Sequence, residues 1–121
     1  MKIISWNVNG IRSVLTKGFD DFLKTEKPDI ICLQETRADE SQVNSDFAEY
    51  PHRFWNPAEK KGYSGTAVFS VVEPLTVTRE LGDDKHHGEG RVITLEYKRF
   101  YLVNVYVPPL VERVRRYPFS F

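Results

Sequence analysis

The first 35 residues have the pattern of a strand, a helix and a second strand, and this pattern constrains the fold most strongly. Residues 2–8 form an apolar run that ends at two asparagines, and "DIICLQE" over residues 29–35 is a second such run. A unit of this kind normally joins two parallel strands by a right-handed crossover. Both strands then end at the same edge of the sheet, where open α/β sheets bind ligands. We therefore expect Asn7 and Glu35 to lie at a common edge.

The segment between the two runs has apolar side chains at helical spacing, with charged residues between them. These apolar residues are Leu15, Phe19, Phe22 and Leu23. Ser13 is of a type that caps helices, and Pro28 is of a type that ends them. The sequence therefore predicts one helix from Ser13 to about Glu26.

The chain beyond residue 35 is predicted to consist mainly of strands. The predicted strands cover residues 52–56, 66–72, 75–81, 91–97 and 100–107. Lys98 and Arg99 turn the last two into a hairpin, and a short helix near residues 41–47 is an option. One early helix cannot cover both faces of such a sheet, so we expect another layer to pack on it.

Composition limits the class of protein. The 121 residues suffice for one domain, and 40% hydrophobic residues are typical of a globular chain. Seventeen basic and 17 acidic residues give zero formal charge, which argues mildly against nucleic acid unless a local basic patch or a metal supplies the field. No apolar run approaches the ~20 residues of a membrane span. We expect no membrane partner, and a cytoplasmic location, or a nuclear one in a eukaryote.

Cysteine and histidine have ordinary interpretations here. Cys32 lies inside an apolar run without the context of a catalytic thiol, which favours a small buried hydrophobe. His86 and His87 are adjacent in an acidic segment and lack the ligand spacing of zinc sites, which favours a solvated loop.

Glu35 is the most informative single residue. Its carboxylate follows "IICLQ" beside buried chain, where an unpaired charge is costly, and no lysine or arginine is obviously assigned to it. Mg²⁺ takes one or two carboxylates and keeps several waters, which leaves positions for phosphate oxygens. The alternatives are a surface glutamate or a cap for the next segment.

Asn7, Tyr106 and the loop "GYSG" over residues 62–65 are further candidates. The Asn7 amide suits a place beside a metal ion and a phosphate, or it closes the first strand in a turn. The Tyr106 phenol could donate to a developing oxyanion, or it is a half-buried core tyrosine. The loop presents Tyr63 for stacking or phosphate contact, or it is a plain turn.

Five segments carry these signals in a fixed order. They are "SWNVNGIR", "PDIICLQET", "KKGYSGTAVFS", "GDDKHHGEGRVI" and "FYLVNVYVP". Together they closely resemble the N-terminal half of the exonuclease III family of apurinic/apyrimidinic endonucleases, within the endonuclease/exonuclease/phosphatase superfamily. The resemblance spans residues 1–108 and leaves residues 109–121 as a divergent tail.

The resemblance implies a fold and an activity. The fold is a four-layer α/β sandwich, of which this chain would form the N-terminal half, mostly one mixed sheet with one or two helices. The activity is Mg²⁺-dependent hydrolysis, with Mn²⁺ as an option, of the phosphodiester 5′ to an abasic site in double-stranded DNA. Many relatives add 3′–5′ exonuclease and 3′-phosphatase activities.

The resemblance also implies roles for individual residues. Glu35 matches the family's metal-binding glutamate, Asn7 the asparagine beside the metal, and Tyr106 the active-site tyrosine near the scissile phosphate. Asn9 stands where some relatives have aspartate, which puts a direct metal role there in doubt. The residues that match positions contacting or framing the DNA backbone are Arg12, Tyr63 and Arg91.

The family's later Gly-Asp-x-Asn and Ser-Asp-His motifs, which supply the base, are absent from these 121 residues. We therefore expect the chain alone to be weakly active or inactive. We also expect an exposed apolar sheet face that self-associates or pairs with a C-terminal half. The alternatives are a phosphoesterase of the same superfamily and a non-catalytic module that binds DNA or protein.

Overall fold

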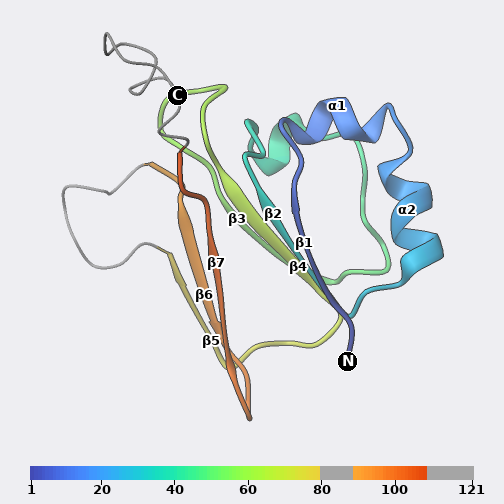
Figure 1. Cartoon of the computed structure of the whole chain (residues 1–121), viewed down its shortest axis with the longest axis vertical. Coiled ribbons are helices and arrows are strands. Elements are labelled where there is room, and N and C mark those ends of the chain that lie inside the picture. Colours follow the sequence, from blue (N-terminus) through green and yellow to red (C-terminus); the bar gives the residue numbers. More distant parts are fainter. Residues whose placement is uncertain (80–88, 109–121) are drawn as a thin grey trace, which may run out of the picture.

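The computed structural model describes residues 1–79 and 89–108 of the chain, and within them the strands form two packed sheets (Figure 1). The first sheet has the order β1-β2-β4-β3. Its strands are β1 (Ile3–Asn7), β2 (Ile30–Gln34), β3 (His52–Asn56) and β4 (Thr66–Ser70). β1 and β2 are parallel, with Asn7 opposite Gln34, whereas β4 is antiparallel to both of its neighbours. The predicted parallel pair is confirmed.

The second sheet has the order β5-β6-β7 and is antiparallel. Its strands are β5 (Thr76–Arg79), β6 (Val92–Glu96) and β7 (Tyr101–Val105). β6 and β7 form the predicted hairpin. β7 packs against β2 and β4, and β6 packs against β3 and β4.

The α/β class and the two-sheet sandwich with helices outside are confirmed, but the expectation of mostly one sheet is wrong for the described strands. The chain leaves the first sheet after β4 because the Ser70 hydroxyl turns it. Ser70 Oγ donates to the Val72 carbonyl at 2.6 Å and accepts from the Val72 N–H at 3.1 Å. Pro74 follows, and it has no N–H with which to continue a ladder. The chain therefore starts a second sheet at β5.

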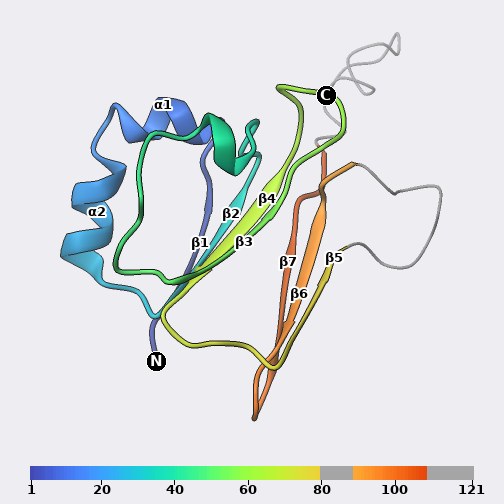
Figure 2. The ribbon, with the colours of Figure 1, turned by 180° about the vertical axis from the view of Figure 1, so that it is seen from behind.

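The predicted single helix is two helices, α1 (Ile11–Leu15) and α2 (Phe19–Glu26). Gly18 separates them at φ 100° and stands at the N-cap of α2, so Ser13 lies inside α1 and is not a cap. The short helix near residues 41–47 is a 3-10 turn over Glu40–Gln42. Both helices lie on the outer face of the first sheet, as Figure 2 shows from behind.

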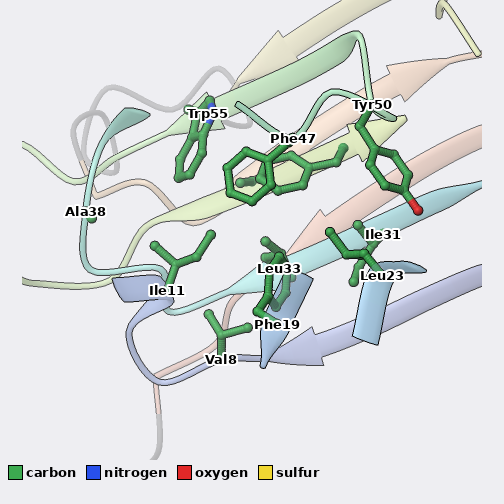
Figure 3. Close-up of a cluster of buried hydrophobic side chains, with 12 residues drawn as sticks. Val8, Ile11, Phe19, Leu23, Ile31, Leu33, Ala38, Phe47, Tyr50 and Trp55 are labelled. Atoms are coloured by element: carbon green, nitrogen blue, oxygen red, sulfur yellow. The ribbon is translucent and has the colours of Figure 1, made fainter. Parts of the chain in front are cut away.

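Two apolar clusters share the strands β2 and β4. One fills the space between the first sheet and its helices (Figure 3). In it the ring of Phe47 packs against the rings of both Phe19 and Phe69. The other lies between the two sheets and contains Cys32. Cys32 is 4% exposed, and burial raises the pKa of its thiol to about 11. The prediction of a small buried hydrophobe is confirmed.

The outer face of the second sheet carries exposed apolar side chains, and no described helix covers it (Figure 1). Alternate residues along β7 and beyond it point outward: Tyr101, Val103, Val105 and Val107. These side chains form an exposed apolar face of the kind expected from the sequence. Within the described residues, no helix has the length and apolar character needed to cross a membrane.

Candidate functional site

A cleft of about 650 Å³ lies where β2 and β7 end and where β6 begins. Four of the residues predicted from the sequence line it: Glu35, Tyr63, Arg91 and Tyr106. Glu35 directly follows β2 of the first sheet, whereas Tyr106 directly follows β7 of the second. Residues about 70 positions apart in the chain are therefore brought together by the packing of the sheets.

The backbone that carries Glu35 is fixed by segments on both sides of it. The Glu35 carbonyl accepts from the Gly10 N–H at 2.8 Å, in the turn that follows β1. The Arg37 N–H donates to the Ser64 carbonyl at 2.8 Å, in the loop that precedes β4. Glu35 and Arg37 both adopt the left-handed region, at φ 57° and 56°. Each such residue costs about 1–2 kcal/mol, and such conformations persist where the surroundings impose them.

Gly65 gives the same turn its close packing. Its φ is 93°, and a Cβ atom there would lie 2.3 Å from the Thr36 hydroxyl oxygen. The Thr36 N–H donates to the Gly65 carbonyl at 3.0 Å, and the Thr36 side chain is buried. Only glycine satisfies both the backbone angle and the close approach at this position.

The Glu35 carboxylate pairs with the Arg37 guanidinium, Nη2 to Oε1, at 2.5 Å. The Glu35 side chain is 17% exposed and that of Arg37 is 46% exposed. No lysine or arginine is an obvious partner for Glu35 in the sequence, but the structure provides one in Arg37. The pair was missed because it depends on the left-handed backbone of both residues, for which glutamate and arginine give no sequence signal.

Tyr106 is half-buried in the cleft, and its N–H donates to the Arg91 carbonyl at 2.8 Å. Burial, followed by the negative charge of Glu35, raises the pKa of the Tyr106 phenol above its usual value of 10.0. The positive charges of Arg37 and Arg91 act in the opposite direction. The phenol is therefore protonated at neutral pH and available as a hydrogen-bond donor.

Cations give the cleft a positive rim although the whole chain has no net formal charge. Arg37, Lys61 and Arg91 all line it. The Arg91 Nε lies 3.0 Å from the Glu89 carboxylate. Tyr63 is 57% exposed, and the ammonium of Lys60 lies 4.2 Å from its ring centroid. A cleft with this rim suits an anionic ligand such as a phosphate.

Asn7 and Arg12 are not among the described residues that line the cleft. The Asn7 side-chain oxygen accepts from the Asn9 N–H at 3.0 Å, as in the turn interpretation. Asn9 and Gly10 complete that turn with φ values of 48° and 99°. Asn7 still lies at the expected edge, since its strand pairs with β2 up to Gln34. Arg12 is exposed on α1.

The donor set suits a hard divalent cation that keeps most of its waters. Glu35 offers one carboxylate in an open cleft, and Mg²⁺ or Mn²⁺ sites often contain only one or two protein carboxylates. Among the described residues there is no group of three or more His, Cys, Asp or Glu side chains that could enclose a metal. Glu35 is thus the residue that would hold such a cation. His86, His87 and residues 109–121 lie outside the described residues.

Comparison with known proteins agrees with these features. The Endonuclease/Exonuclease/phosphatase family matches residues 4–120. The exodeoxyribonuclease of Bacillus subtilis is 54% identical over 109 residues, which are 89% of this chain and 43% of the relative. The DNA-(apurinic or apyrimidinic site) endonuclease of Dictyostelium discoideum is 48% identical over 110 residues, which are 89% of this chain and 30% of the relative.

A solved structure gives the same result. An AP endonuclease from Archaeoglobus fulgidus superposes with a TM-score of 0.73 at 33% identity, over 89% of this chain and 41% of that protein. The chain thus spans less than half the length of these relatives. The resemblance to the exonuclease III type seen in the sequence is confirmed. Because the family match extends over nearly all residues, the chain belongs to the endonuclease/exonuclease/phosphatase family.

Proposed function

We propose that this chain provides the N-terminal half of the active site of an exonuclease III-type DNA repair nuclease. The reaction is hydrolysis of the phosphodiester 5′ to an abasic site in double-stranded DNA, with 3′–5′ exonuclease and 3′-phosphatase activities as further options. The observation that carries the proposal is the meeting of Glu35 and Tyr106, from different sheets, in one cleft with a positive rim. The cytosol, or the nucleus in a eukaryote, is the corresponding compartment.

The chain's own residues divide the work between binding and proton donation. Arg91 and Lys61 attract the phosphate into the cleft, and Tyr63 is exposed at its rim to contact the DNA backbone. The protonated Tyr106 phenol donates to a phosphoryl oxygen as negative charge develops there. Glu35 would hold Mg²⁺ or Mn²⁺, and such a cation would act as a Lewis acid on the phosphoryl oxygen. Asn7 lies at the same edge of the sheet without lining the cleft, and it matches the asparagine that the family has beside the metal.

Because these residues supply binding and proton donation but no base, we expect low activity from the isolated chain. An attacking water also needs a base, and the cleft-lining residues include one carboxylate, which pairs with Arg37. We infer that the remaining groups come from a C-terminal half. The exposed side chains of β7 support an interface on the second sheet, occupied by such a half or by a second copy.

Reconstitution tests this function. The 121-residue chain is mixed with the segment of the Bacillus subtilis relative that it does not cover, and cleavage of a duplex with one stable abasic analogue is measured with and without Mg²⁺. We expect strong cleavage by the mixture and little by the chain alone. Glu35→Gln in the mixture should remove most of the activity. Rapid Mg²⁺-dependent cleavage by the chain alone that survives Glu35→Gln would contradict both the proposal and the site.

A non-catalytic DNA-binding module is the second candidate, and it is favoured because Glu35 is the one carboxylate among the described residues that line the cleft. It predicts that the chain binds the abasic duplex but that no mixture cleaves it. Arg91→Ala should then weaken binding and reduce its dependence on salt, because phosphate contacts release counterions. Binding and cleavage measured on the same samples separate the two candidates.

A further inference from the structure

One side chain beneath the cleft connects the three strands that carry the proposed site residues. The Gln34 Nε2 donates to the Asn104 Oδ1 at 2.8 Å and to the Ser5 Oγ at 2.9 Å. Gln34 is the last residue of β2, whereas Ser5 lies on β1 and Asn104 lies on β7. An amide nitrogen has two hydrogens, and these are its two shortest hydrogen bonds, since its third acceptor, the Cys32 carbonyl, lies at 3.4 Å.

Each member of this trio is close in sequence to one residue of the proposed site. Gln34 directly precedes Glu35, and Asn104 lies two residues before Tyr106. Ser5 lies two residues before Asn7. Neighbours on a strand move together, because the backbone between them is fixed by ladder hydrogen bonds.

Asn104 is itself held from three directions. Its Nδ2 donates to the Leu33 carbonyl at 3.0 Å and to the Ala67 carbonyl at 2.9 Å, while its Oδ1 accepts from Gln34. The side chain is 2% exposed. A buried carboxamide with three directed bonds has one orientation available, because losing any of them leaves a polar group unsatisfied.

The other positions where the two sheets touch show that packing alone does not require the amide pair of Gln34 and Asn104. The side chains that face the other sheet are apolar further along, Ile30 and Cys32 on β2 and Leu102 on β7. Apolar contacts fix the distance between two sheets, but they resist sliding only weakly compared with directed hydrogen bonds. Gln34 and Asn104 take the place of such apolar side chains at the last position on β2 and on β7 that faces the other sheet before the cleft.

We propose that Gln34 and Asn104 are positioning residues that fix the ends of β2 and β7 relative to each other, and thereby the placement of Glu35 against Tyr106. The value of this placement for catalysis rests on the proposed function, but the placement itself does not. Gln34→Met keeps a side chain of similar length and removes both hydrogen bonds. Tyr97→Phe is the matched control, because it removes another bond between the sheets, from the Tyr97 hydroxyl to the Ser70 hydroxyl at 2.8 Å.

The test is spectroscopic and needs no cleavage. The chain is labelled with ¹³C at tyrosine Cζ, the Tyr106 resonance is assigned with Tyr106→Phe, and the shift change caused by Glu35→Gln is recorded. We expect a clear shift change in the parent chain and in Tyr97→Phe, and a much smaller one in Gln34→Met. An undiminished response in Gln34→Met overturns the inference. If Gln34→Met does not fold by circular dichroism, Ser5→Ala loosens one arm of the trio and should give an intermediate response, whereas a full response again overturns it.

A kinetic arm connects the placement to the proposed function. In the reconstituted nuclease, Gln34→Met should lower kcat by roughly tenfold to a hundredfold, the scale for a small misplacement of reacting groups, with KM little changed. Tyr97→Phe should leave both constants near those of the parent. If no mixture cleaves DNA, the proposed function fails while the spectroscopic result still decides the positioning role.

Discussion

The guanidinium of Arg37 lies 2.5 Å from the carboxylate of Glu35, and both residues hold left-handed backbone conformations. The carboxylate proposed to hold a divalent cation thus already has a cation within the chain. The pair is partly exposed, so solvent screens it and the ion pair is weak enough to exchange. Arg37 contacts Oε1 of Glu35, so a divalent cation at the proposed site would compete with Arg37 for that oxygen atom.

Removing Arg37 should therefore strengthen binding of a divalent cation. Arg37→Ala is expected to lower the dissociation constant for Mn²⁺ about twofold to fivefold, the scale of a screened ion pair. Mn²⁺ titration followed by electron paramagnetic resonance measures this directly. Lys61→Ala is the control, since Lys61 lines the same cleft and no ion pair joins it to Glu35 among the described residues. Equal gains in both variants would show that only the general charge of the cleft matters.

Gly65 should tolerate substitution poorly, because it lies in the turn that carries Glu35. Gly65→Ala places a Cβ atom 2.3 Å from the Thr36 hydroxyl oxygen at a φ of 93°, so the turn that carries Glu35 must shift. We expect the free energy of unfolding to fall by about 2–4 kcal/mol. Urea titration measures it.

Gly62→Ala is the matched control for that loss. Gly62 also has a positive φ, of 81°, but a Cβ atom there meets nothing within 4 Å. Its cost should be the backbone strain alone, about 1 kcal/mol. Equal losses for the two variants would mean that contact with Thr36 does not restrict the turn.

Tyr106 should act through its proton. Tyr106→Phe in the reconstituted nuclease is expected to lower kcat by about 10²-fold, because a donor to the developing charge is lost. The pKa of the Tyr106 phenol is raised above its usual value of 10.0, so the phenol stays protonated at neutral pH. Its titration therefore causes no fall in rate in that range. Rates measured from pH 6 to 9 check both points. A rise in KM with kcat unchanged would instead assign Tyr106 to substrate binding.

Local sequence patterns predicted the strands and the helical segment but not the tertiary contacts between them. The parallel pair of β1 and β2 followed from two apolar runs that end in polar groups, and the β6–β7 hairpin followed from the charged pair between two apolar runs. The division into two helices had a visible signal, Gly18, but helical spacing on both sides of it obscured the break. Glycine permits the left-handed conformation that ends one helix and begins another.

The contacts of the site depend on segments that are far apart in sequence. Glu35 meets Arg37 because hydrogen bonds from Gly10 and to Ser64 impose the turn. Gln34 meets Asn104 only once two sheets are stacked in one register. A single sequence contains no pattern for either contact, so Glu35 and Tyr106 were predicted as individual residues whereas Arg37 was not.

The outer face of β7 should control self-association of the chain. Val103 and Val105 are 54% and 45% exposed on this face. The double change Val103→Lys and Val105→Lys adds charge without filling the core, so it should prevent association while the fold persists. Sedimentation velocity across a concentration series measures the change. Lys17→Glu, in the exposed turn between α1 and α2, is the control and should leave association unaltered. A parent chain that stays monomeric at high concentration would exclude a second copy as the occupant of this face and leave the C-terminal half.

Cys32 should make the stability fall in alkaline solution. Burial raises the pKa of its thiol from 9.0 to about 11, so between these values the unfolded chain loses the proton while the folded chain retains it. The folded state then binds more protons than the unfolded state, and stability falls as pH rises. The contribution of the thiol to the free energy of unfolding is fully present below pH 9, and by pH 11 about 2–3 kcal/mol of it is lost.

Cys32→Val keeps an apolar side chain and removes the titrating group. Urea unfolding from pH 8 to 11 should therefore show a steeper decline for the parent than for Cys32→Val, and parallel declines would mean that other groups, such as the buried tyrosines, govern the alkaline range.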